Sequence, residues 1–221
     1  MEILLSAKNI SKTFQGKKVL DDINIDIFKS EIVAISGTSG AGKTTLLNIL
    51  STLDNPDKNK NSSLIIDNQE TFSLGKNDLA TLRNQKIGFV FQFHELIPEL
   101  NILENVCLPG WIKRDNSVKK KAIKLLEYLG LHDVTNKKPL TLSGGEKQRV
   151  AIARSLINNP KIIFADEPTG NLDSENSKIL FDLLFKLRDD HNCSVVIVTH
   201  NEENAKICDR KLLIIDGKIK N

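Results

Sequence analysis

The pattern of apolar and polar residues along the chain predicts short strands and helices. Near the N-terminus, residues 3–7 and 19–28 have the composition of strands, and a turn at residues 15–17 would join them. Between Ile23 and Ile27, isoleucine alternates with polar residues, which is typical of an antiparallel strand with one buried face. We therefore expect a small antiparallel sheet at the start of the chain.

Later in the chain, short apolar runs alternate with helical patterns. Residues 46–53 place four apolar side chains on one helical face, and residues 78–83 and 174–188 also have helical patterns. Apolar runs between helices indicate buried strands, so the pattern predicts an α/β fold with a largely parallel sheet. The runs are residues 31–36, 64–67, 87–91, 161–165, 194–199 and 211–216.

Residues 93–140 contain little strand pattern and several helical signals. Ser117 is expected to cap a helix that runs to Gly130, with buried residues at Val118, Ile123, Leu126 and Leu129. Lysines 119, 120, 121 and 124 lie outside that stripe and are expected to be solvated. We expect a single domain over residues 1–221, with residues 1–92 and 141–221 as the core and residues 93–140 as a helical insert.

Composition narrows the class of protein. Hydrophobic content of 40% and charged content of 27% over 221 residues are ordinary for a globular domain, and a net charge of +3 gives no indication of nucleic-acid binding. Three cysteines without metal-type spacing are expected to be reduced thiols. With no signal peptide and no bilayer-spanning run in this sequence, we expect any action at a membrane to depend on a partner.

The strand at residues 31–36 leads into a phosphate-binding loop. The loop matches G-x-x-x-x-G-K-[ST] in the required order of strand, loop and helix. Lys43 is expected to reach the β- and γ-phosphates of ATP, and the Thr44 hydroxyl is expected to ligate Mg²⁺. The expected nucleotide-binding residues are Gly37, Thr38, Ser39, Gly40, Ala41, Gly42, Lys43, Thr44 and Thr45.

Three other predicted strands end in polar residues that could take part in catalysis or metal binding. Asp166 and Glu167 follow residues 161–165, and we expect Asp166 to bind Mg²⁺ and Glu167 to polarise the attacking water; capping acids are the alternative. Gln92 ends another strand and could touch the metal or the water. His200 ends a third strand and could bond a γ-phosphate oxygen. The carboxyl ends of parallel strands are where such sites assemble.

Residues 142–149, Leu-Ser-Gly-Gly-Glu-Lys-Gln-Arg, predict a loop that turns into a helix. Ser143 can cap that helix, and its N-terminus offers N–H groups to an anion; an ordinary capped helix is the alternative. An apolar stripe from Val150 to Ile157 would bury one face. Phe14, just before the first turn, is either a core aromatic or a platform for a nucleobase.

In their order along the chain, these motifs resemble the nucleotide-binding subunit of ABC transporters. Phe14 matches the A-loop, residues 37–45 Walker A, Gln92 the Q-loop, residues 142–149 the signature and His200 the H-loop. The Walker B strand and the D-loop at residues 171–173 complete the set. The resemblance implies a P-loop NTPase (RecA-like) fold and ATP hydrolysis with Mg²⁺. It also implies an ATP-bound homodimer in which Ser143, Gly144 and Gly145 act in trans.

A narrower resemblance is to the ATPase of lipoprotein-releasing (Lol) systems. Residues 82–98, 104–106 and 168–174 carry it, although Phe14 replaces tyrosine, residues 57–63 lack a Ser-Gly turn, and Glu95 replaces a second histidine. It implies a peripheral ATPase on the cytoplasmic face of the inner membrane. The alternatives are a macrolide- or peptide-exporter ATPase, an ATP-gated regulator of a cell-division scaffold, and a soluble ABC protein of repair or translation.

The segment from 93 to 108 is the expected docking site for integral membrane subunits. It is rich in apolar residues and interrupted by Pro98, so an exposed apolar groove is expected there. A purely structural insert is the alternative. The apolar residues are Phe93, Leu96, Ile97, Leu100, Ile102 and Leu108.

Overall fold

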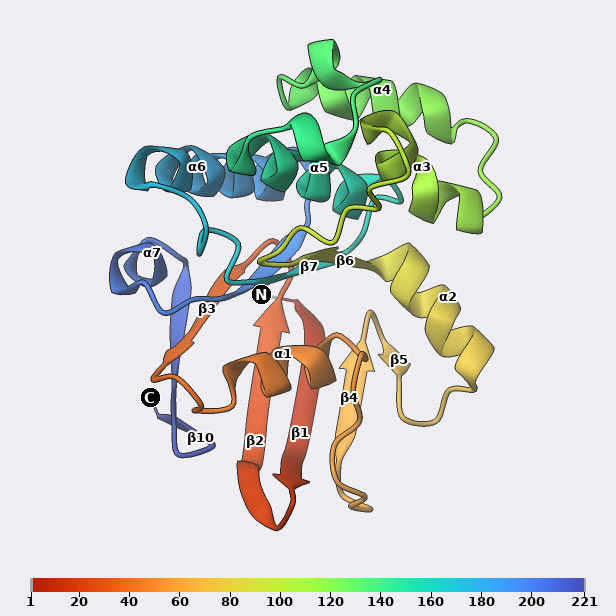
Figure 1. Ribbon diagram of the computed structural model, residues 1–221. Coiled ribbons are helices and arrows are strands. Elements are labelled where there is room, and N and C mark those ends of the chain that lie inside the picture. The colour runs from red at the N-terminus through yellow and green to blue at the C-terminus, as the bar shows by residue number, and fades with distance from the viewer. Residues whose placement is uncertain (1, 221) are drawn as a thin grey trace.

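The computed structural model describes residues 2–220, so positions 1 and 221 of the expected domain lie outside the described residues. Two β-sheets and two groups of helices build the molecule (Figure 1). The larger sheet lies between a helical layer, drawn at the top of the figure, and a smaller antiparallel sheet, drawn at the bottom. This arrangement confirms the expected α/β fold with an N-terminal antiparallel subdomain.

The larger sheet has six strands in the order β10-β9-β3-β8-β7-β6. Neighbouring strands from β9 to β6 are parallel, and only β10 pairs antiparallel. The central strands β3 and β8 are largely apolar and almost entirely buried because both faces of the sheet are covered. The bounds are β3 (Ile32–Gly37), β6 (Ile87–Val90), β7 (Ile162–Asp166), β8 (Ser194–Val198), β9 (Arg210–Ile215) and β10 (Lys218–Lys220).

The smaller sheet is antiparallel, with the order β2-β1-β4-β5. A two-residue turn joins β1 to β2, and both of its residues have positive φ, 47° at Gln15 and 80° at Gly16. Positive φ at both positions matches the right-handed twist of the flanking strands. The bounds are β1 (Ile3–Phe14), β2 (Lys17–Phe28), β4 (Ser63–Ile66) and β5 (Gln69–Glu70).

Helices cover both faces of the larger sheet. Helix α1 (Lys43–Leu50) lies between the two sheets, and four helices form the layer on the opposite face (Figure 1). Those four are α3 (Ile102–Ile112), α4 (Val118–Tyr128), α5 (Gly144–Leu156) and α6 (Ser174–His191). The remaining helices are α2 (Lys76–Lys86), α7 (Glu202–Lys206) and two 3₁₀ turns, His132–Val134 and Pro139–Thr141.

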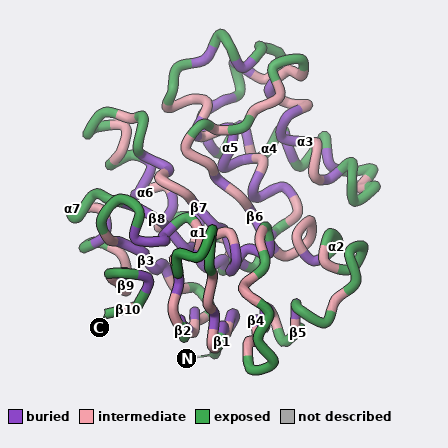
Figure 2. The backbone as a smooth tube through the Cα atoms, turned by 60° about the horizontal axis from the view of Figure 1, so that its bottom comes forward, coloured by how far each residue is buried: buried purple, intermediate pink, exposed green. Residues whose placement is uncertain are grey.

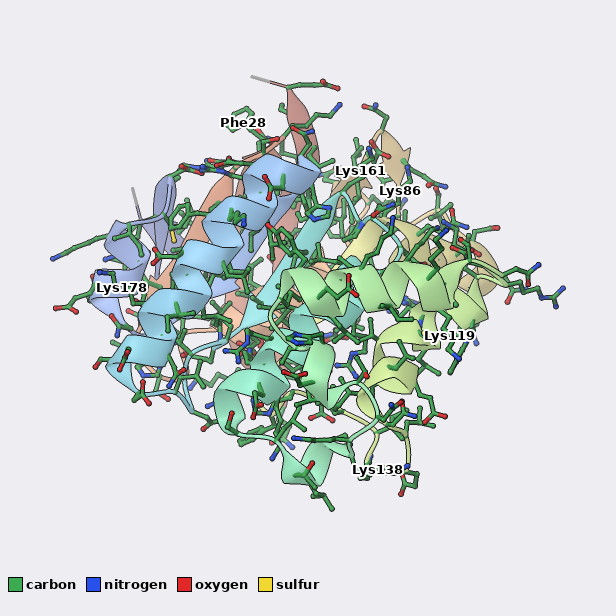
Figure 3. The ribbon with its side chains drawn as sticks, turned by 90° about the horizontal axis from the view of Figure 1, so that it is seen from above. Phe28, Lys86, Lys119, Lys138, Lys161 and Lys178 are labelled. Atoms are coloured by element: carbon green, nitrogen blue, oxygen red, sulfur yellow. The ribbon has the colours of Figure 1, made fainter. Side chains whose placement is uncertain are left out.

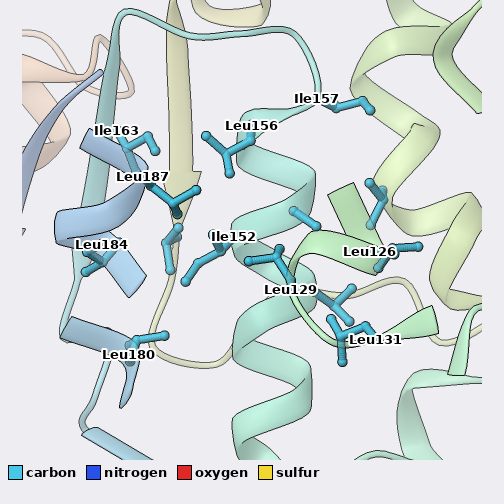
Figure 4. Packing of buried hydrophobic residues seen from close by; sticks show 14 of the residues in the cluster. Leu126, Leu129, Leu131, Ile152, Leu156, Ile157, Ile163, Leu180, Leu184 and Leu187 are labelled. Atoms are coloured by element: carbon cyan, nitrogen blue, oxygen red, sulfur yellow. The ribbon is translucent and has the colours of Figure 1, made fainter. Parts of the chain in front are cut away.

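The six-stranded sheet separates two hydrophobic cores. Figure 2 shows buried stretches of the backbone along the strands of this sheet, with exposed stretches mainly in the loops. One core joins α1 to the antiparallel sheet, and the other joins the helical layer to the sheet. In the helical layer, α5 is central: Ile152 and Leu156 lie between the leucines of α6 and those near the end of α4 (Figure 4). The apolar stripe expected from Val150 to Ile157 is therefore confirmed as a buried face.

Several expected details are wrong. Leu53 is 47% exposed because α1 ends at Leu50, and Ile123 is 37% exposed because the buried face of α4 is narrower than expected. Ser117 occupies the N-cap position of α4, but its side chain donates to Asp115 rather than capping the helix. Strand β1 extends beyond residue 7, through a register irregularity near Asn9, which has φ of 52°.

Residues 93–140 contain α3, α4, the first 3₁₀ turn and the start of the second, and no strand lies there. The four lysines of α4 are exposed as expected, and Lys119 lies at the periphery of the layer (Figure 3). All three cysteines are free thiols. Within residues 2–220, no helix combines the length and apolarity needed to cross a membrane.

Candidate functional site

The loop between β3 and α1 is shaped to hold an anion. At Gly42, φ is 100°, and a Cβ atom there would lie 2.8 Å from the Val19 carbonyl oxygen, so the position requires glycine. The first N–H groups of α1 have no partner within the helix and face the loop. A pocket of about 280 Å³ lies at this helix start, lined by Val19, Ser39, Gly40, Gly42, Lys43, Thr44, Thr45 and Glu167.

Lys43 is tied to the phosphate-binding loop itself. Its ammonium donates to the carbonyl oxygens of Gly37 (2.9 Å) and Thr38 (3.0 Å), and the residue is only 9% exposed. Ala41 also belongs to the loop, but it packs into the core and does not line the pocket. The sequence therefore brings Lys43 to the pocket, with its charge held by backbone carbonyls.

Asp166 lies across from the start of α1. The Thr44 hydroxyl donates to Asp166 Oδ1 over 3.3 Å, which joins two residues 122 positions apart. Burial raises the pKa of Asp166 above its ordinary value, and the Thr44 hydrogen bond opposes that rise. Two of the three expected magnesium ligands, Thr44 and Asp166, therefore lie close together beside the pocket.

Glu167 is held in an unusual backbone conformation at the end of β7. Its φ is 47°, in the left-handed region, and its N–H donates to the Val198 carbonyl of β8 over 2.9 Å. Its carboxylate lies 2.6 Å from His200 Nδ1. The Glu167 side chain is 17% exposed and also lines the pocket, so this acid reaches the phosphate-binding loop.

Gln92 contacts the loop after Asp166 rather than the pocket. Its carbonyl accepts a hydrogen bond from Asn171 Nδ2 at 3.0 Å, and its side-chain amide lies so close to Gly170 that a Cβ there would be 2.8 Å from Nε2. Among the described residues, those that line the phosphate-loop pocket do not include Gln92. The Q-loop and D-loop segments therefore touch each other within one chain.

The signature segment folds as a capped helix start. Ser143 Oγ accepts from the Glu146 N–H at 3.3 Å, and Glu146 accepts from the Ser143 N–H at 2.8 Å, so the two residues form a capping box. The Ser143 hydrogen bonds lower the pKa of the Glu146 carboxyl. Ser143 and Gly144 are exposed, and neither they nor Gly145 line the phosphate-loop pocket.

Phe14 is not part of a core. It ends β1 beside the turn and is 47% exposed. The Lys12 ammonium lies 5.1 Å from the centroid of its ring. Phe14 lies on the hairpin that supplies Val19 to the pocket. This position and the exposure of the Phe14 ring fit an aromatic platform better than a core residue.

Sequence reasoning missed Arg154 of α5. The residue is half-buried, and its guanidinium donates to the carbonyl oxygens of His94, at 2.7 Å, and Glu95. His94 and Glu95 both have positive φ, 63° and 48°, so the loop after Gln92 is held in a strained conformation. In the sequence, Arg154 is recognisable only as a charged residue beside the apolar stripe of α5. Its partners could not be identified, because they lie about 60 positions away along the chain.

A second hollow lies between the core and the helical layer. It has a volume of about 460 Å³, and its lining comes from α2, β6, α3, α5 and the loop after Gln92. Most of its lining residues are apolar, and Arg83, Glu95 and Arg154 supply charge. Hereafter we call this hollow the lateral groove; its lining includes Leu53, Phe89, Phe91, Glu95, Ile112 and Arg154.

Comparison with known proteins decides the family. Residues 20–170 match the model of the family described as "ABC transporter". The chain belongs to the ABC transporter family. Among curated ABC proteins, the lipoprotein-releasing system ATP-binding protein LolD of Bacteroides thetaiotaomicron is 48% identical over 98% of this chain and 99% of its own length. The protein of the same name from Aquifex aeolicus is 46% identical over 99% and 97%.

Solved ABC structures agree with this assignment. The ATP-binding cassette MJ0796, in a dimeric post-hydrolysis state bound to ADP and phosphate, superposes with a TM-score of 0.89. The two proteins are 40% identical, and the alignment covers 98% of this chain and 97% of the other. The P-loop NTPase fold is thus confirmed, and the chain is an ABC ATPase subunit that couples ATP hydrolysis to transport.

Proposed function

We propose that this ABC ATPase drives the release of lipoproteins from the inner membrane, working with integral membrane subunits. The observation that carries the proposal is likeness over nearly the full chain, at 48% and 46% identity, to proteins named as ATP-binding components of lipoprotein-releasing systems. The alignments cover 99% and 97% of the length of those two relatives.

The ATP site is assigned to the phosphate-binding loop and the strand ends around it. Residues 37–45 bind the phosphates, with Lys43 as the cation, and Phe14 stacks on the base. This assignment is supported by the strand order, in which β3, β8, β7 and β6 are adjacent. The carboxyl ends of these parallel strands bring the phosphate-binding loop, His200, the two acids and Gln92 to one edge of the sheet.

Glu167 is the proposed general base. It accepts a proton from water as the water oxygen forms a bond to the γ-phosphorus, and the bond to the bridging oxygen of ADP breaks. His200 keeps the Glu167 carboxylate in place and faces the γ-phosphate oxygens. Gln92 is proposed to contact the water or metal when the Q-loop moves toward the pocket.

The residues beside the pocket suit a bound Mg²⁺. Magnesium prefers oxygen ligands and retains water, and Thr44 and Asp166 present a hydroxyl and a carboxylate 3.3 Å apart. Gln92 could add an amide oxygen. The ion would neutralise charge on the phosphates, and these residues would position it.

A homodimer would complete each site. Ser143, Gly144 and Gly145 lie outside the phosphate-loop pocket of their own chain, at an exposed helix start suited to a phosphate. A second copy placed head to tail would supply these three residues in trans. The dimeric state described for the structural relative supports this arrangement.

The lateral groove is the proposed docking site for the membrane subunits, on the cytoplasmic face of the membrane. Of the expected segment 93–108, only Glu95 lines the groove, and Pro109 and Ile112 follow it there. Ile102 is fully buried, whereas Phe93 is 72% exposed beside the Q-loop. The groove therefore refines the expected surface toward α2 and the end of α3.

Reconstitution tests the proposed function. The chain would be purified with the membrane proteins that bind it and placed in proteoliposomes that contain a labelled lipoprotein. We expect ATP-dependent release of the lipoprotein, and no release with the Glu167→Gln variant. Hydrolysis that is stimulated by the membrane proteins, without lipoprotein release, would contradict the assigned cargo.

A further inference from the structure

Lys12 is fixed in place two residues before Phe14. Its ammonium lies 2.8 Å from Asp54 Oδ2 and donates to Asp54 Oδ1 at 2.9 Å and to the Asn55 carbonyl at 2.5 Å. Its side chain is 14% exposed. Lys8, which lies on the same strand as Lys12 and pairs with Asp26 of β2, has a side chain that is 46% exposed. Lys12 is therefore an ordered cation rather than a mobile surface lysine.

The ordered ammonium also lies over the Phe14 ring, 5.1 Å from its centroid. This distance is within the range of a cation–π interaction, which holds a cation against one face of an aromatic ring. The ring remains 47% exposed, so the cation does not cover it. We propose that Lys12 is a positioning residue for the nucleobase: it occupies one face of Phe14 and presents the opposite face to the base of ATP.

The proposal rests on the role of Phe14 in the proposed ATP site, and physical reasoning supports it. An exposed phenylalanine at a hairpin end has several accessible rotamers, and stacking on a base would require one of them to be selected. A cation held on one side restricts the ring before the nucleotide arrives. Such preorganisation lowers the entropic cost of binding.

The tether also joins the base end of the site to the phosphate end. Asp54 follows α1, the helix that starts at the phosphate-binding loop, and its N–H bonds to the Asn48 carbonyl of that helix at 3.1 Å. Lys12 thus links β1, which carries Phe14, to the helix that carries Lys43 and Thr44. This contact relates the position of the aromatic platform to that of the phosphates.

Calorimetric titration of the full chain with Mg-ATP and, separately, with Mg-tripolyphosphate tests the proposal, because tripolyphosphate has no base. Lys12→Met should weaken ATP binding about two- to five-fold and leave tripolyphosphate binding unchanged. Lys12→Arg should retain ATP affinity, since a guanidinium also interacts with an aromatic face. Lys8→Met is the matched control, because Lys8 pairs with Asp26 but covers no ring, and it should change neither affinity.

A double-mutant cycle with Phe14→Ala separates the two assignments. If Lys12 acts through the ring, Lys12→Met should have no further effect on ATP affinity in the Phe14→Ala background. The proposal would be overturned if Lys12→Met lost ATP and tripolyphosphate affinity equally. It would also be overturned if Lys12→Met weakened ATP binding as strongly in the Phe14→Ala background as in the wild type. Unchanged ATP affinity in Phe14→Ala alone would instead overturn the base platform of the proposed ATP site.

Discussion

His200 Nδ1 lies 2.6 Å from Glu167 Oε2, which joins the ends of two adjacent strands, β8 and β7. The histidine side chain is 69% exposed, whereas the glutamate side chain is only 17% exposed. The Glu167 backbone is held by Val198 of β8 as well. Two contacts from one neighbouring strand therefore fix the direction of this acid.

The first prediction concerns Glu167. Glu167→Gln preserves shape and removes the charge that accepts the proton, so turnover should fall by about 10²–10⁴ while ATP still binds. Steady-state ATPase and nucleotide titration measure both. His200→Ala should also slow turnover by freeing the Glu167 carboxylate. Near-normal hydrolysis by Glu167→Gln would remove this residue from its proposed role.

Lys43→Ala should weaken ATP binding. It removes a charge beside the phosphates, and losing a charged hydrogen bond of about 1.5–3 kcal/mol corresponds to roughly ten-fold or more in affinity. Fluorescent-nucleotide titration measures the change. Lys119→Ala is the control, because that exposed lysine lies at the periphery of the helical layer (Figure 3). Equal affinities for both variants would contradict the assignment of Lys43.

Ser143→Arg should block hydrolysis without blocking ATP binding to a single chain. The substitution fills an exposed helix start that does not line the chain's own phosphate-loop pocket. Light scattering with ATP should show loss of the dimer in a Glu167→Gln background. Full activity of a monomer at high dilution would disprove completion of the site in trans.

Arg154→Met should loosen the loop after Gln92. Two carbonyls, those of His94 and Glu95, would lose their donor, and we expect a stability loss of about 2–3 kcal/mol. Urea unfolding measures the loss, with exposed Arg114→Met as the control. Since Arg154 and Glu95 line the lateral groove, stimulation by membrane subunits should fall more than basal ATPase. If the membrane subunits stimulated the ATPase of the Arg154→Met variant as strongly as that of wild type, the contact of Arg154 with this loop would have no role in docking.

The pair between Asp67 and Lys86 should make stability depend on pH. The Lys86 ammonium, 2.6 Å away, lowers the pKa of Asp67 below its ordinary value. A lowered pKa stabilises the fold above the unfolded-state pKa, and that stabilisation disappears as pH falls through the folded-state pKa. Asp67→Asn should therefore destabilise the protein slightly at pH 7, by about 0.2–1 kcal/mol, and match wild type below the folded-state pKa.

Asparagine suits this test because residue 67 has φ of 49°, a region that asparagine tolerates well. Urea unfolding between neutral and acid pH measures the difference between the two proteins. A gap that stays constant as pH falls would show that the charge of Asp67 is not its source.

Most of the features that could be predicted came from local patterns in the sequence. The phosphate-binding loop, the acids after β7 and the capped start of α5 are all read from consecutive residues, and the structure places them in the expected elements. Leu53 and Ile123 continued a helical apolar pattern but proved exposed, since helix ends and the width of a buried face depend on neighbouring elements.

Contacts between distant residues could not be predicted. Arg154 reaches carbonyls 59 and 60 positions away, and Lys12 reaches Asp54 across 42 positions. No short pattern marks these partners, because each pair depends on how α5 or β1 packs in the finished fold. The lateral groove is similar, since it forms where five separate segments meet. The roles assigned to the ATP-site residues remain predictions for the experiments above.

The order of strands β3, β8, β7 and β6 has a consequence for how such proteins diversify. The groups proposed for hydrolysis lie at the carboxyl ends of these strands, whereas the lateral groove is lined mainly by α2, β6 and the end of α3. Substitutions of groove residues in α2 and α3 are therefore expected to leave the hydrolytic groups in place, because none of them lines the phosphate-loop pocket. If the lateral groove is the docking site, substitutions in its lining would change the membrane partner while the same ATPase site is inherited.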